Sequence, residues 1–328
     1  MRGIAAGVAA GAVAGAALRR WWSAREALAA VRPELRSPLL PFIPGVTART
    51  LPVVRAVSRL RTPPGPGVSV TEHDAGDGVR LRVLVAEPVE REPLRPAVLW
   101  IHSGGLVVGS PQFELGLAGP LVRELGAVVV LPDYRLAPEH PFPAALDDCM
   151  ATLAWMRTHA GQLGIDADRI AVAGPSAGGG LSAAVAQRCL DEGITLRAQA
   201  LVYPMLDDRV TLRDNGGRGR FLWTAAGSRF GWQAYLGREP AHSTAPPYSA
   251  AARRTDLTGL APAWIGVGDQ DLLYDESVDY ADRLTACGVP CELVAVPGMY
   301  HGAELFGRRS EVMRDFQAAM VGHLRTYL

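Results

Sequence analysis

Residues 170–178, Ile-Ala-Val-Ala-Gly-Pro-Ser-Ala-Gly, decide how this chain is interpreted. The apolar run at 170–173 suits a buried β-strand, and a helix-compatible run begins at Ala177. Between them lies the pattern Gly-x-Ser-x-Gly, centred on Ser176. A turn from strand to helix with this pattern is so tight that small residues must stand two positions before and after the serine. We therefore predict that Ser176 is a nucleophile, and that the amide of Ala177 faces the same site.

A serine hydroxyl needs a base, a group that orients the base, and donors for an oxyanion. In this arrangement the acid and the histidine follow the serine along the chain. Among the later histidines, His242 falls in an irregular segment and His323 near the end of the last predicted helix, whereas His301 follows a predicted strand. His301 is therefore the predicted base. The candidates for the acid follow the apolar run at 263–267 and are Asp269, Asp271 and Asp275.

An earlier glycine-rich loop is the candidate for the oxyanion donors. His102-Ser103-Gly104-Gly105 follows the apolar run at 97–101. Two adjacent glycines let the backbone turn its N–H groups toward a substrate carbonyl. Because this loop and the turn at Ser176 are independent segments, their joint presence predicts one site more strongly than either does alone.

Apolar runs alternate with helix-like stretches through most of the chain. This alternation predicts an α/β fold with a mostly parallel central sheet that is flanked by helices. Alternating apolar and polar residues at 68–70 and 79–85, around the Asp77-Gly78 turn signal, predict an antiparallel start. The runs lie at 97–101, 127–131, 170–173, 198–202, 263–267 and 293–296, and the helix-like stretches at 112–125, 144–160, 177–192, 276–287 and 310–327.

Two segments depart from the alternation. Residues 23–67 are rich in proline and can hold only short helices between the breaks, which predicts a lid or packing arm. Residues 207–250 contain no strand-like run and fall between two core strands. Such an insertion predicts a cap over the edge of the sheet where open α/β sheets bind ligands.

Residues 1–22 form an extension of different composition. From Gly3 to Leu18 there are only Gly, Ala, Val, Ile and Leu, followed by two arginines and two tryptophans. As a helix, residues 3–18 would span about 24 Å, short of the roughly 30 Å hydrocarbon core. A disordered extension, a membrane anchor and a cleaved signal peptide therefore all stay open. An anchor followed by arginines would leave the domain in the cytoplasm, which is the location that we expect, with or without membrane association.

Composition excludes some partners. The 33 basic and 33 acidic side chains cancel, so the chain lacks the positive field that nucleic-acid binding requires. The four cysteines make no disulfide framework, and none has zinc-ligand spacing beside a histidine pair. We expect reduced cysteines, and we leave open a bridge between Cys287 and Cys291, which flank a short turn.

Together these motifs resemble those of the hormone-sensitive-lipase-like esterases, also called bacterial family IV carboxylesterases. The resemblance covers about residues 68–328. It rests on the oxyanion motif at 102–105, the turn at Ser176, the signature Asp-Tyr-Arg-Leu-Ala-Pro-Glu-His-Pro-Phe-Pro-Ala-Ala at 133–145, the acid stretch at 271–276, and Tyr300-His301-Gly302. It implies an α/β-hydrolase catalytic domain at 68–328, whose helical cap comes from the first 67 residues (23–67 in particular) and from 207–250.

The resemblance also implies roles for single residues. The family's acid motif places the catalytic aspartate two positions before a leucine and four before a second acid, which selects Asp271. Gly104, Gly105 and Ala177 would supply the oxyanion N–H groups, with His102 in a supporting position. Two residues depart from the family pattern: Ser103 stands where glycine is usual and Pro175 where aspartate is usual. Glu139 and His140 of the signature are expected to be structural.

The resemblance predicts a serine carboxylic-ester hydrolase for short to medium acyl esters, with an acyl-enzyme intermediate and no metal or organic cofactor. Its partner is a small-molecule ester, and a homodimer stays open. One alternative is an amidase or peptidase, because the triad does not distinguish an ester from an amide. A second is a ligand-binding receptor on the same fold, against which the joint presence of Ser176, Asp271 and His301 argues.

Overall fold

The computed structural model describes residues 19–76, 81–90 and 94–328. Its centre is an eight-stranded sheet with the strand order β1-β2-β4-β3-β5-β6-β7-β8. The strands are β1 (Val68–Asp74), β2 (Arg82–Pro88), β3 (Arg95–Trp100), β4 (Val128–Pro132), β5 (Ile165–Pro175), β6 (Gln199–Val202), β7 (Ala263–Gly268) and β8 (Cys291–Val296). The sheet confirms the expected α/β class.

Strand direction follows the sequence pattern. β2 pairs antiparallel with both β1 and β4, whereas the pairs from β4 to β8 are parallel. The predicted antiparallel start is therefore confirmed, although the Asp77-Gly78 turn lies outside the described residues. β2 runs beyond its expected end at Val85, because its ladder with β1 continues to the pair of Val68 and Pro88.

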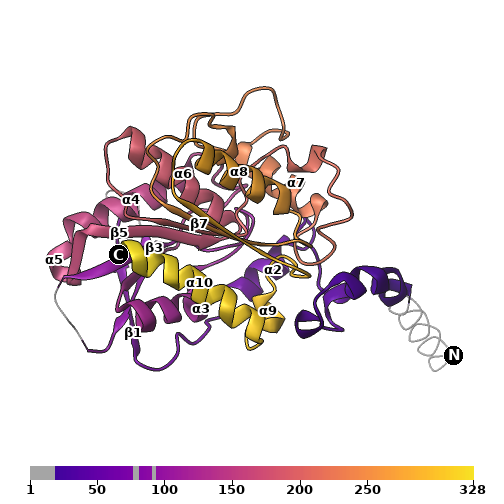
Figure 1. Cartoon of the computed structure of the whole chain (residues 1–328), viewed down its shortest axis with the longest axis horizontal. Coiled ribbons are helices and arrows are strands. Elements are labelled where there is room, and N and C mark those ends of the chain that lie inside the picture. Colours follow the sequence, from indigo (N-terminus) through magenta and orange to yellow (C-terminus); the bar gives the residue numbers. More distant parts are fainter. Residues whose placement is uncertain (1–18, 77–80, 91–93) are drawn as a thin grey trace.

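Helices cover both faces of the sheet (Figure 1). α3 and α10 pack on one face, with α4, α6 and α8 on the other. All five lie close to the helix-like stretches expected from the sequence. Their bounds are α3 (Pro111–Leu125), α4 (Ala144–Thr158), α6 (Ala177–Asp191), α8 (Tyr274–Ala286) and α10 (Glu311–Tyr327), and the short α5 (Ala160–Leu163) follows α4.

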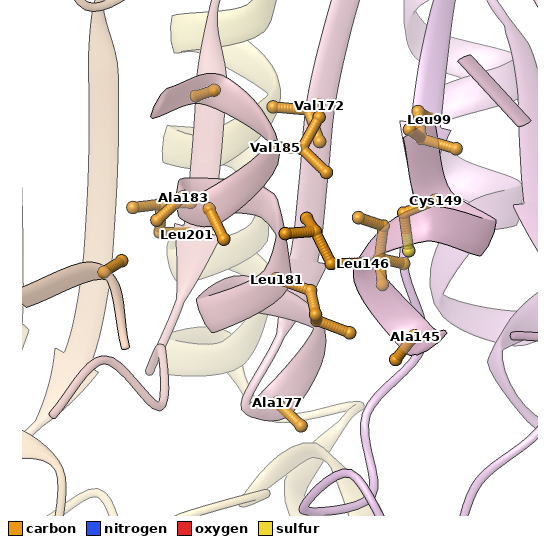
Figure 2. Packing of buried hydrophobic residues seen from close by; sticks show 14 of the residues in the cluster. Leu99, Ala145, Leu146, Cys149, Val172, Ala177, Leu181, Ala183, Val185 and Leu201 are labelled. Atoms are coloured by element: carbon orange, nitrogen blue, oxygen red, sulfur yellow. The ribbon is translucent and has the colours of Figure 1, made fainter. Parts of the chain in front are cut away.

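The core consists of two layers, because successive strand residues point to opposite faces. On β3, Leu99 belongs to the layer under α4 and α6, whereas Val98 and Trp100 belong to the layer under α3 and α10. Figure 2 shows the first of these layers, with Leu181 of α6 and Cys149 of α4 directed toward the strands. Both faces of the central strands are thus buried, which explains why their sequences are continuous apolar runs.

The two irregular segments contain short elements. Residues 19–30 are helical and precede the first proline of the arm, Pro33. The arm then holds η1 (Pro33–Leu35), η2 (Leu40–Phe42) and α2 (Leu51–Ser58). The insertion at 207–250 holds η3 (Val210–Leu212) and α7 (Ala225–Leu236), followed by η4 (Ala251–Arg253). A further short helix, α9 (Glu304–Gly307), connects β8 to α10.

The N-terminal segment and the cysteines were the subject of two further expectations. The segment at 3–18, for which a membrane anchor stayed open, lies outside them. In the part of the chain that the structure describes, no helix has both the length and the apolar character needed to cross a bilayer. All four cysteines are free, and Cys149 and Cys189 are buried. The bridge left open between Cys287 and Cys291 is therefore absent from the structure.

Candidate active site

Ser176 stands at the sharp turn between β5 and α6. Its backbone has φ 56° and ψ −119°, a conformation that L-residues rarely adopt. The flanking glycines are required by the close approach of β3. A Cβ at position 174 would lie 2.3 Å from the carbonyl oxygen of Ile101, and one at position 178 would lie 1.9 Å from it. The structure thus gives the steric reason for the Gly-x-Ser-x-Gly pattern.

His301 and Asp271 come from two neighbouring loops. Asp271 follows β7, and His301 follows β8. The Nδ1 atom of His301 lies 2.7 Å from Oδ2 of Asp271, and its Nε2 atom lies 2.9 Å from Oγ of Ser176. Asp271 is fully buried, and its Oδ1 accepts a hydrogen bond of 2.9 Å from the amide of Leu273. The structure therefore brings together all three residues predicted from the sequence.

The rival acids have other partners. Oδ1 of Asp269 accepts a hydrogen bond of 2.7 Å from the amide of Gly298 and so connects the two loops. Asp275 lies in the first turn of α8 and forms an ion pair of 2.8 Å with Arg218 from the insertion. His323 lies on α10, where its ring contacts that of Tyr327 in a tilted arrangement, with 5.0 Å between centroids. None of these side chains contacts Ser176 within the described structure.

The glycine-rich loop after β3 reaches the same site. Gly104 has φ 123° and Gly105 has φ 59°, both in the region that favours glycine. A Cβ at position 105 would lie 2.1 Å from the indole of Trp223, and one at position 104 would lie 2.0 Å from the carbonyl oxygen of Val108. Among the hydrogen bonds of the described residues, none is donated by the amides of Gly104, Gly105 or Ala177. These amides are therefore free to serve a ligand.

His102 packs beneath the glycine-rich loop, in the interior of the protein. It is fully buried, its Nδ1 lies 2.7 Å from the carbonyl oxygen of Ser103, and its ring stacks on Tyr134 with 3.9 Å between ring centroids. The hydroxyl of Tyr134 donates to the carbonyl of His102 at 3.0 Å. Burial lowers the pKa of His102 to about 4, so its ring is neutral at physiological pH.

The two departures from the family pattern have different surroundings. The hydroxyl of Ser103 donates to Oε1 of Glu114 at 2.5 Å, and its amide donates to the same oxygen at 3.0 Å. Burial raises the pKa of Glu114, although these hydrogen bonds oppose the shift. Pro175 instead lines a small apolar chamber of about 50 Å³, together with Trp100 and Phe316. Ser103 thus adds a side-chain hydrogen bond that glycine at this position could not make.

The signature at 133–145 anchors the loops around the site. Glu139 accepts two hydrogen bonds of 2.7 Å from Arg55 of α2, and this contact lowers the pKa of Glu139 to about 2. Arg55 also donates to the carbonyl oxygens of Val107 and Ala137, at 2.8 Å and 2.9 Å. Arg135 forms a bidentate pair with the buried Asp148. Glu139 therefore has a structural contact, as expected.

A cavity of about 410 Å³ opens at Ser176. Both irregular segments line it, the arm through Val46 and Thr62 and the insertion through Leu222 and Trp223. Trp232 and Tyr235 of the insertion instead contact each other in a tilted arrangement, with 6.1 Å between ring centroids. No group of three or more His, Cys, Asp or Glu side chains in the described ranges is arranged to hold a metal ion. The other residues that line the cavity are Ser103, Gly104, Gly105, Phe113, Glu114, Leu117, Tyr203, His301, Gly302, Glu304, Leu305 and Arg308.

Known proteins share this sequence and architecture. A family model of the alpha/beta hydrolase fold matches residues 98–305. Carboxylesterase NlhH of Mycobacterium tuberculosis is 38% identical over 261 residues, which are 76% of this chain and 81% of that protein. Ethyl acetate hydrolase of Pseudomonas putida is 32% identical over 252 residues, 75% of this chain and 77% of the relative.

Solved structures agree with these relatives. A bacterial heroin esterase superposes with a TM-score of 0.84 at 34% identity, and the match covers 92% of this chain and 99% of that one. Esterase LipW from Mycobacterium marinum gives a TM-score of 0.79 at 30% identity, over 92% and 97% of the two chains. The chain belongs to the hormone-sensitive-lipase-like carboxylesterases. This esterase is a carboxylic ester hydrolase of the α/β-hydrolase fold.

Several residues around the site of the esterase escaped the sequence analysis. Arg55, Glu114, Tyr203 and Glu304 have no motif of their own, and each makes its contact with a residue distant in sequence or on another element. Tyr203 directly follows the predicted strand at 198–202, and its place at a strand end was the one available signal.

The lowered pKa of His102 predicts a pH dependence of stability. Between about pH 6.5 and pH 4 the unfolded chain binds a proton at this residue that the folded esterase does not bind. The free energy of unfolding therefore decreases as the pH is lowered through that window. His102→Phe keeps a ring beside Tyr134 but cannot titrate. The free energy of unfolding, measured with urea at pH 7 and at pH 5, should decrease between these two pH values by about 2 kcal/mol less in the variant than in the wild type. Equal losses would refute the assignment.

Proposed function

We propose that this esterase hydrolyses small-molecule esters through a triad of Ser176, His301 and Asp271. One observation carries the proposal: the imidazole of His301 connects the other two side chains, with 2.9 Å to Oγ of Ser176 and 2.7 Å to Oδ2 of Asp271. The carboxylate at Nδ1 favours the tautomer with its proton on that nitrogen, which leaves Nε2 free to accept one.

The reaction begins when Oγ of Ser176 attacks the ester carbonyl carbon and Nε2 of His301 takes the serine proton. Negative charge then develops on the carbonyl oxygen. The unpaired amides of Gly104, Gly105 and Ala177 are the proposed donors to this oxyanion. The C–O bond to the alcohol breaks, and the imidazolium of His301 returns its proton to the departing alkoxide. An acyl group remains on Ser176.

Hydrolysis of the acyl-enzyme repeats these steps with water as the nucleophile. His301 accepts a proton from the water, the same amides hold the second oxyanion, and the carboxylic acid leaves as Ser176 regains its proton. Asp271 stays ionised and stabilises the imidazolium in both halves. Its complete burial and its hydrogen bond from Leu273 fit this orienting role.

We also propose that residues 23–67 and 207–250 form a cap that limits substrate size, on a catalytic domain at 68–328. The cap would contribute Val46 and Thr62 from the first segment and Leu222 and Trp223 from the second. Trp223 packs directly on Gly105, so it encloses the space next to the proposed oxyanion donors. A pocket bounded by these side chains would favour short to medium acyl chains over long ones.

Replacement of the proposed nucleophile tests the mechanism. Ser176→Ala should lower turnover of a nitrophenyl ester on the order of 10⁶-fold and leave the circular-dichroism spectrum unchanged. A serine-directed phosphonate should label the wild type once, at Ser176. If the variant kept more than about a tenth of the wild-type rate, the proposed nucleophile would be wrong.

The orienting acid is tested by three matched amide variants. Asp271→Asn should lose roughly 10⁴-fold in kcat, because the imidazole then adopts the wrong tautomer. Asp269→Asn and Asp275→Asn should lose at most about tenfold, since Asp269 contacts the amide of Gly298 and Asp275 pairs with Arg218. A severe loss in Asp269→Asn with a nearly normal Asp271→Asn would place the acid two residues earlier.

Substrate size is tested with a series of nitrophenyl esters. Acyl chains of about two to eight carbons should give higher kcat/KM than a chain of sixteen, because Trp223 lines the cavity and packs on Gly105, next to the proposed oxyanion donors. Trp223→Ala should move the optimum toward longer chains. Faster cleavage of the sixteen-carbon ester than of the four-carbon ester by the wild type would contradict the proposed cap.

A further inference from the structure

Beside the proposed triad lies a second hydrogen-bonded pair, Tyr203 and Glu304. The hydroxyl of Tyr203 lies 2.5 Å from Oε1 of Glu304. The two residues are far apart in sequence, since Tyr203 follows β6 and Glu304 begins α9. Both line the cavity that opens at Ser176. Neither has a role in the mechanism described above.

The two residues of the pair are related to His301 in different ways. The ring of Tyr203 contacts the imidazole of His301 edge to face, with 4.7 Å between centroids and 61° between planes. Glu304 stands only three residues after His301 along the same loop. His301 is therefore connected to the pair in two ways. The backbone joins it to Glu304, and the ring of Tyr203, which is hydrogen-bonded to Glu304, contacts its imidazole.

Tyr203 is itself held rigidly. It is only 2% exposed, its amide donates to the carbonyl of Gly266 at 2.6 Å, and its backbone has φ 35° although it is not glycine. Non-glycine residues keep such a conformation only where the surrounding structure imposes it, often at functional sites. Tyr203 thus presents a fixed surface to the imidazole.

Other hydrogen bonds of the loop hold its backbone and its neighbours rather than the imidazole: the amide of Gly298 donates to Asp269, and the hydroxyl of Tyr300 donates to the carbonyl of Leu35. The hydrogen bonds of the imidazole, at Nδ1 with Asp271 and at Nε2 with Ser176, fix its two nitrogen atoms but leave the ring free to rotate about the line that joins them. Trp223 is the next ring, with its centroid 6.0 Å away. Catalytic side chains on loops require packing around them to stay within a fraction of an ångström of the productive geometry.

The surroundings of Glu304 make its hydrogen bond to Tyr203 important. Burial raises the pKa of Glu304, and the neighbouring titratable groups are His301, Asp271, Glu114 of α3 and Arg308. The residue is partly exposed as a whole, but its Oε2 atom is buried and has no hydrogen-bond partner in the described structure. The hydroxyl of Tyr203 is therefore the main polar contact of this carboxyl group, and removing it leaves a buried acid unpaired.

We propose that Tyr203 and Glu304 are positioning residues for His301: their hydrogen bond clamps the loop of His301 onto the end of β6 and fixes the tilt of the imidazole toward Ser176. This inference rests on the proposed triad. The clamp is proposed to act through the hydrogen bond and not through the charge of Glu304. A glutamine at position 304, which can still accept a hydrogen bond from Tyr203, should therefore preserve it.

The test compares steady-state kinetics of matched variants with a nitrophenyl butyrate substrate. Tyr203→Phe and Glu304→Ala should each lower kcat roughly tenfold, because a small misplacement of the base slows the chemical step. KM should change by less than about twofold. Glu304→Gln, which keeps an acceptor for Tyr203, should recover most of the lost kcat. The double variant of Tyr203→Phe and Glu304→Ala should be no slower than either single variant.

Tyr248→Phe is the matched control, because the hydroxyl of Tyr248 also donates to a carboxylate, Asp191, at 2.8 Å, but neither residue lines the cavity. This control should keep the wild-type kcat, and thermal unfolding of every variant checks the fold. A wild-type kcat in Tyr203→Phe, a loss in Glu304→Gln as large as in Glu304→Ala, or losses that appear in KM would each overturn the clamp. If Glu304→Ala does not fold, the comparison of kcat between Tyr203→Phe and Glu304→Gln still tests the clamp.

The two proposals fail in different ways. Activity that survives Ser176→Ala would contradict the triad itself. A dead Ser176→Ala with a fully active Tyr203→Phe would leave the triad in place and contradict only the clamp.

Discussion

The close approach of the turn at Ser176 to the end of β3 is the constraint on which the rest of the site depends. No side chain fits at positions 174 and 178, because each would lie within 2.3 Å of the carbonyl oxygen of Ile101. The approach forces Ser176 into its unusual backbone conformation and leaves the amide of Ala177, at the first position of α6, without an intrahelical partner. One steric contact thus produces both a hydroxyl that faces the cavity and an oriented N–H group.

The remaining groups are arranged by the parallel sheet. β5, β6, β7 and β8 are neighbours in that order, so the loops at their carboxyl ends meet at one edge. Ser176 follows β5, Tyr203 follows β6, Asp271 follows β7 and His301 follows β8. The four side chains come from separate parts of the chain, yet topology alone places them within contact distance. On the other side of β5, the glycine-rich loop follows β3 and completes the arrangement.

Buried carboxyl groups are a further feature of this site. Glu114 receives hydrogen bonds from Ser103 and Trp100, and Glu304 is paired with Tyr203. Burial raises the pKa of both acids, since an ionised carboxylate is costly in a low-dielectric environment. Each acid accepts a hydrogen bond from a side chain on another element, so each connects the segments that contact it.

By itself, the sequence determined the α/β fold, the order of its strands and helices, and the identity of Ser176, His301 and Asp271 as neighbours in one site. It could do so because these features are local: a tight turn demands glycine, a doubly covered strand demands a continuous apolar run, and a family motif preserves spacing. Asp271 could be separated from Asp269 and Asp275 only through the family's spacing, and their different contacts in the structure agree with that choice. The pairs of Arg55 with Glu139, Ser103 with Glu114, and Tyr203 with Glu304 were decided only by the tertiary structure. Their partners lie 84, 11 and 101 residues apart, and no local pattern records which distant side chain will be brought to a buried polar group when the chain folds.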